Sequence, residues 1–98
     1  MVNRTIENKK LGVKATIKEN LRQRDLEAFG ESRAAETGVS ASQSRGANVR
    51  AAINAAWFTE LTPAMTAEQV GDQIPAVVRL LGDWIDKIYV ELIEIPPE

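Results

Sequence analysis

A chain of 98 residues is long enough for one small domain, and its 27% charged and 44% apolar residues are ordinary for a globular protein. It contains no cysteine and no histidine, which excludes disulfides, thiolate metal sites and the commonest general base. The N-terminus shows no signal-peptide pattern, and no stretch approaches the ~20 apolar residues of a membrane span. We therefore expect a cytoplasmic protein without a membrane anchor.

The charge is distributed unevenly along the chain. Residues 1–50 carry ten Lys or Arg and six Asp or Glu, whereas residues 51–98 carry two and eight. A chain polarised in this way can attract copies of itself head to tail or steer a charged partner, although the two halves can also neutralise each other within one fold. A core this small is marginal, which favours a homo-oligomer.

The first predicted element is a β-hairpin over residues 2–18. Apolar residues alternate with polar ones at Leu11, Val13, Ala15 and Ile17, a period of two that is typical of a strand with one buried face. The preceding "VNRTIE" supplies the partner strand, and "NKKLG" holds the turn.

Two helices with a loop between them are predicted next. Leu21, Leu26 and Phe29 recur with helical spacing, which indicates a helix over 22–36 that Gly30 weakens. The small polar residues of 37–47 are typical of a loop. The alanine-rich segment 48–61 predicts a second helix, which ends at "LTP" because proline disfavours a helical residue before it.

The C-terminal region, 66–94, gives the strongest helical pattern. Thr66 and Gln69 fit a capping box, and Asp72 can cap the next helix, with Pro75 in its first turn. Apolar residues then recur at intervals of four and three at Ile74, Val78, Leu81, Ile85, Ile88, Leu92 and Ile95. The predicted fold is a small, mostly helical α+β domain with an N-terminal β-hairpin and a long amphipathic C-terminal helix.

That helix is apolar over more than one packing face, so part of it must meet a second element or a second chain. We predict that it binds a protein partner through Trp84, Ile85, Ile88 and Leu92. Trp57 and Phe58 are second choices for the same surface. The alternative is that the tryptophans fill the core, which a chain with so few aromatic residues favours for at least one of them.

Nucleic-acid binding through the basic hairpin is the rival prediction, with Lys10, Lys14 and Lys18 contacting phosphates. Two observations argue against it. No aromatic residue precedes Phe29, so the hairpin offers no platform for base stacking. The pI of about 5.2 is also acidic, whereas nucleic-acid binders are usually basic.

An enzyme is the weakest prediction, and we assign no catalytic residue, metal site or cofactor. A nucleophile would have to come from Ser40, Ser42 or Ser44, which lie in a segment with the composition of a solvated loop. The carboxylate pairs of the C-terminal helix are more typical of a wet helix face than of a Ca²⁺ site. No glycine-rich phosphate cradle is present.

The order of elements, together with Leu21, Arg24, Asp25 and Phe29 at the start of the first helix, resembles the small tail assembly chaperones of long-tailed phages. The resemblance implies a non-enzymatic viral protein in the cytoplasm of a bacterial host. Its partners would be the tape-measure protein, whose apolar helices such chaperones keep soluble, and tail-tube subunits. Another small virion protein, such as a connector or tube component, would share most of these features.

Overall fold

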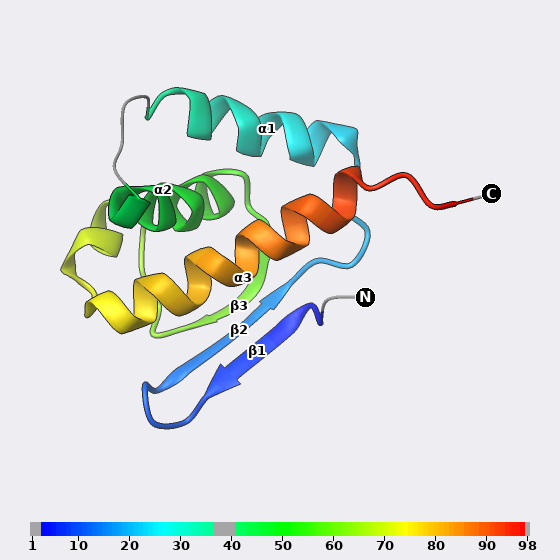
Figure 1. Cartoon of the computed structure of the whole chain (residues 1–98). Helices are drawn as coiled ribbons and strands as arrows, with labels where there is room; N and C mark the ends of the chain where they lie inside the picture. Colours follow the sequence, from blue (N-terminus) through cyan, green and yellow to red (C-terminus); the bar gives the residue numbers. More distant parts are fainter. Residues whose placement is uncertain (1–2, 37–40, 98) are drawn as a thin grey trace.

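A computed structural model describes residues 3–36 and 41–97, and its elements form one α+β domain (Figure 1). In chain order they are β1 (Thr5–Asn8), β2 (Val13–Ile17), α1 (Gln23–Ala34), α2 (Ala41–Asn54), β3 (Phe58–Thr62), the short 3-10 helix η1 (Glu68–Asp72) and α3 (Pro75–Ile93). The predicted fold class is confirmed, including the N-terminal hairpin and the long C-terminal helix.

The hairpin forms as predicted within its described residues. Strands β1 and β2 pair antiparallel, with Ile6 opposite Ala15. Gly12 adopts a φ of 68° in the turn, a backbone conformation that glycine takes without steric cost. In β2 the side chains of Val13, Ala15 and Ile17 are buried, so the predicted alternation is confirmed.

Helix α1 also follows the prediction. The carboxylate of Asp25 accepts a hydrogen bond from the backbone N–H of Arg22 at 2.9 Å, which satisfies a free donor at the helix start. Phe29 faces the core together with Leu21, which precedes the helix. Nothing lies within 4 Å of a Cβ built on Gly30, so this residue weakens the helix without serving a close contact.

The predicted loop over 37–47 is wrong from residue 41 onward, since α2 begins at Ala41. Residues 37–40 lie outside the described residues. This helix crosses α3 closely at Gly82, where an added Cβ would approach Arg45 backbone and side-chain atoms to 2.7 Å. Ala47, Val49, Ala51 and Ala52 are buried in the same helix. Small side chains allow α2 to approach its neighbours closely, which composition alone does not reveal.

The predicted helix over 48–61 is also wrong at its C-terminal end. Helix α2 stops at Asn54 with Ala56 in the left-handed region, at a φ of 56°. The backbone N–H of Trp57 donates to Ala52 O, and that of Ala56 donates to Ile53 O, the pair of bonds that defines a Schellman motif. Residues 58–62 then form β3, which pairs antiparallel with β2 and completes a three-stranded sheet.

The C-terminal region forms a short helix followed by a long one, as predicted. Thr66 and Gln69 exchange the two hydrogen bonds of the predicted capping box, at 3.0 and 3.3 Å. Asp72 does not cap α3: it lies in η1, and Ile74 occupies the N-cap position without a side-chain hydrogen bond. Pro75 stands in the first turn of α3, where its missing N–H costs nothing.

The core lies between the sheet and the helices. Figure 1 shows α3 crossing in front of the sheet, while α2 packs against both α1 and α3. The buried face of β2 and the middle of α3 contribute side chains to the same apolar cluster. The opposite face of the sheet carries polar and charged side chains, as a half-buried antiparallel sheet requires.

Candidate interaction surface

Most of the predicted contact residues lie in the core. Trp84, Ile85, Ile88 and Trp57 are buried within the chain, so they do not form an exposed contact surface and the prediction for them is wrong. Trp57 shows why. Its ring stacks on Phe29 at a centroid distance of 4.5 Å, and its indole N–H donates to the backbone oxygen of Asp25 at 3.0 Å.

Trp84 is a second core tryptophan with its polar atom satisfied. Its indole N–H donates to the backbone oxygen of Asn3 at 2.9 Å, which ties α3 to the segment before β1. Phe58 and Leu92 are half-buried against the same core, and the rings of Phe58 and Trp84 lie 6.5 Å apart. The predicted stripe of α3 is therefore occupied by the chain's own sheet and helices.

The exposed apolar side chains lie farther along, at the end of α3. Ile74, Val90, Ile93 and Ile95 are the large apolar residues exposed among the described residues, and three of these four fall between 90 and 95. Ile95 is the extreme case, with 89% of its surface exposed. Pro96 and Pro97 follow and are exposed as well. We call Val90, Ile93, Ile95, Pro96 and Pro97 the tail surface.

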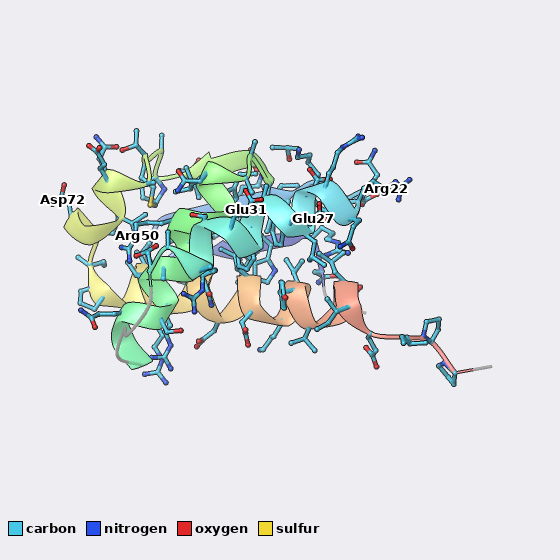
Figure 2. All side chains as sticks on the ribbon, turned by 90° about the horizontal axis from the view of Figure 1, so that it is seen from above. Arg22, Glu27, Glu31, Arg50 and Asp72 are labelled. Atoms are coloured by element: carbon cyan, nitrogen blue, oxygen red, sulfur yellow. The ribbon has the colours of Figure 1, made fainter. Side chains whose placement is uncertain are left out.

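Ile95, Pro96 and Pro97 of the tail surface lie on a segment that projects from the body of the domain, whereas Val90 and Ile93 lie in the last turns of α3. Figures 1 and 2 both show the chain after α3 running away from the rest of the molecule. Helix α3 ends at Ile93, and Glu94 is already extended, with φ −71° and ψ 130°. The helix cannot continue far beyond this point, since Ile95 precedes a proline and is pushed out of the helical region, and Pro96 has no N–H to donate.

Acidic side chains flank the tail surface. Glu91 pairs with Arg4 at 3.8 Å, so its charge is partly compensated inside the chain. Glu94 is exposed and forms no ion pair with any described residue. In the sequence, no Lys or Arg follows Lys87. The tail surface is therefore apolar with a negative charge at its base.

A pocket of about 700 Å³ borders the opposite end of α3, and its charged lining residues are basic rather than acidic. It lies between α2, η1 and the first turns of α3. We call it the arginine pocket, and it is lined by the charged Arg45, Arg50 and Arg79 and by the apolar Val70, Pro75 and Val78, among others. None of the described residues that line it is acidic.

The arginines of this pocket are held by carboxylates outside its lining. Arg45 donates to Asp83 Oδ1 at 2.8 Å, and Arg79 approaches the other oxygen of the same carboxylate at 3.9 Å. Arg50 pairs with Glu36 and is labelled on α2 in Figure 2. Three guanidinium groups thus share two carboxylates, and Arg79 is the most exposed of the three.

A second hollow, of about 540 Å³, opens between α1, α2 and α3. Its wall includes Arg33, whose Nε donates to Asn48 Oδ1 at 2.7 Å and whose second nitrogen donates to Ser44 Oγ at 3.3 Å. Asn48 in turn donates to the backbone oxygen of Gly82 at 3.3 Å. These contacts satisfy the one buried polar side chain of the described core and join the three helices.

The lysines of the rival prediction alternate with acidic residues. Lys14 Nζ lies 3.9 Å from Glu60 Oε1, and Lys18 Nζ lies 4.0 Å from Asp25 Oδ1. The outer face of the sheet also carries Glu7 directly opposite Lys14, and only Lys10, in the hairpin turn, stands apart from these pairs. This face therefore lacks the continuous positive charge that favours phosphate contacts.

The other chemical groups considered in the sequence are dispersed or engaged. Ser42 and Ser44 lie in α2 rather than in a loop, and Ser40 lies outside the described residues. In residues 3–36 and 41–97, no three acidic side chains gather to hold a metal ion. No helix of that part of the chain has both the length and the apolar character needed to cross a membrane.

Comparisons with protein-family models, with curated proteins and with solved structures find no match for this chain. Two features were missed by the sequence reasoning: the tail surface and the arginine pocket. The tail surface had a signal, because Ile95 stands directly before two prolines and so cannot belong to a buried helical stripe. The arginine pocket had none, since its arginines come from two helices that meet only in the folded chain.

Proposed function

We propose that this chain is a non-enzymatic protein-interaction domain that binds another protein chain through the tail surface. The clustering of exposed apolar side chains at the end of α3 carries the proposal. Single exposed apolar residues are ordinary, but a group of them on a projecting segment is typical of a binding site. The pair Pro96 and Pro97 strengthens it, because a segment that is already extended loses little entropy on binding.

The lack of histidine and cysteine supports the non-enzymatic part of the proposal. So does the engagement of Ser44 by Arg33. The resemblance to phage tail assembly chaperones points to the same class of function. Its tape-measure and tail-tube partners, and an oligomeric state, remain predictions.

Affinity purification with matched variants tests the proposal. The tagged protein would be recovered from the cells that naturally make it, as wild type, as an Ile93→Gln/Ile95→Asp variant and as a Lys10→Ala/Lys14→Ala control. We expect a protein partner to be retained by the wild type and the lysine control. The amount of partner recovered with the tail variant should be lower by about tenfold or more, because truncating anchor residues removes most of the binding energy.

Two results would contradict this proposal. One is a partner that binds the tail variant as well as the wild type. The other is salt-sensitive retention of duplex DNA that the lysine control loses and the tail variant keeps, which would favour the nucleic-acid function of the hairpin.

A further inference from the structure

The tail surface and the arginine pocket are complementary in chemistry and stand at opposite ends of α3. The tail surface is apolar and flanked by Glu94, whereas the pocket is lined by apolar side chains and by three arginines. Neither feature finds such a counterpart among the other described surfaces of the chain. The outer face of the sheet mixes both charges, and the hollow beside Arg33 includes Asp86 and Glu36 in its wall.

The described tail does not reach the pocket of its own chain. Helix α3 has 19 residues and is therefore about 27 Å long. The pocket borders its first turns, around Pro75 and Arg79, while residues 94–97 leave from its last turn and span at most about 14 Å when fully extended. Figure 1 shows them continuing away from the domain rather than turning back along α3. An intramolecular contact is thus excluded for this segment.

We infer that the tail surface of one copy of this chain occupies the arginine pocket of a second copy. This inference rests on the proposed function, because it takes the tail surface as the binding surface and names its partner. Ile95 and the two prolines would cover Pro75 and Val78, which removes apolar surface from water on both sides. Glu94 would approach the guanidinium group of Arg79, whose side chain is 71% exposed and shares Asp83 with Arg45.

Such a contact joins two different surfaces, so it is heterologous. Each copy that offers its tail still has an empty pocket, and each copy that fills its pocket still has a free tail. The contact therefore propagates into an open chain of copies, or into a ring where the rotation closes.

Light scattering and sedimentation of the purified protein test this arrangement. The wild type should grow in mass beyond a dimer as its concentration rises to about 1 mM, where even a contact with a Kd of about 1 mM is populated. The mass at a fixed concentration should fall as salt is added, since the exposed charges are screened. Arg79→Glu and Ile95→Asp should each abolish the growth, whereas Arg79→Lys and Ile95→Leu should retain it.

The decisive sample is an equimolar mixture of the two defective chains. The Arg79→Glu chain keeps a working tail and the Ile95→Asp chain keeps a working pocket, so the mixture should form a dimer and nothing larger. Both positions are exposed, and circular dichroism and urea unfolding should show unchanged folds. Arg24→Glu, an equal charge change on the exposed surface of α1, should assemble like the wild type.

Three outcomes would overturn the inference: a wild type that stays monomeric throughout, an Arg79→Glu chain that assembles normally, or a mixture that remains monomeric. These outcomes can be distinguished experimentally from a failure of the proposed function. Loss of assembly in Ile95→Asp alone, with Arg79→Glu unaffected, leaves the tail surface as a binding surface and removes the pocket as its site. A monomeric wild type whose tail still retains a different protein does the same.

Discussion

The middle and the end of α3 are similarly rich in apolar residues, but those of the middle are buried and several of those at the end are exposed. Between residues 81 and 88 the apolar side chains of Leu81, Ile85 and Ile88 are buried, whereas Val90, Ile93 and Ile95 are exposed. The difference lies in which parts of the fold face each segment of α3. The middle faces the sheet and α2. In the last turns Tyr89 and Leu92 still pack against the core, whereas Val90 and Ile93 lie off that packed side of the helix, and the chain after Ile93 runs away from the domain (Figure 1). An apolar stripe therefore predicts that a helix surface will be covered, but it does not identify the element, or the chain, that covers it.

The sharpest test of this contrast places the same charge at both positions. Ile88→Asp should cost about 5 kcal/mol or more and unfold the protein, because it buries a carboxylate without a partner. Ile95→Asp should change the free energy of unfolding by less than about 0.5 kcal/mol. Urea unfolding followed by circular dichroism measures both. A folded Ile88→Asp protein would place the middle of α3 at a surface and restore the contact site predicted from the sequence.

The next test concerns the close crossing of α2 over the middle of α3. Gly82→Ala should destabilise the fold by about 1–3 kcal/mol, since its Cβ would meet Arg45 backbone atoms at 2.7 to 2.8 Å. Gly30→Ala is the matched control in α1. Its Cβ meets nothing within 4 Å, so it should stabilise the protein by about 0.5–1 kcal/mol. Thermal unfolding of the two variants would measure both signs, and equal effects would show that the helices are not in close contact.

The smallest expected effect concerns the turn that sends the chain from α2 into β3. Ala56→Gly should stabilise the fold by about 0.5–1 kcal/mol, because glycine adopts the left-handed conformation at this position without a Cβ clash. Ala28→Gly, at an exposed position inside α1, should destabilise it by a similar amount. Urea midpoints give both values. Destabilisation by Ala56→Gly would mean that α2 continues past Asn54, as the sequence alone suggested.

Local patterns account for the elements that were predicted correctly. The alternation of Val13, Ala15 and Ile17, the capping box of Thr66 and Gln69, and the spacing of Leu81, Ile85 and Ile88 each depend on residues close together in the chain. Backbone hydrogen bonding and the burial of one face act over the same short range. The hairpin and the long helix could therefore be read before the fold was known.

The incorrect predictions concern residues whose structure depends on an element far away in the sequence. Residues 41–47 have the composition of a loop, but they form the first turns of α2, which crosses α3 closely where Arg45 meets Gly82. Residues 58–61 continue an alanine-rich helical pattern, yet they pair with β2, about 40 residues earlier in the chain. The candidate contact surface failed for the same reason, because Trp57 and Trp84 find their partners in Phe29, Asp25 and Asn3.

The α+β class, the hairpin, the long C-terminal helix and the excess of apolar surface follow from composition and from the periods of strand and helix. Which apolar residues are buried within the chain, and which remain exposed at the tail surface, depends on how the elements pack together. It also brought Arg45, Arg50 and Arg79 to one pocket. Burial and charge clustering depend on the packing of elements far apart in the chain, and a local pattern carries no information about that packing.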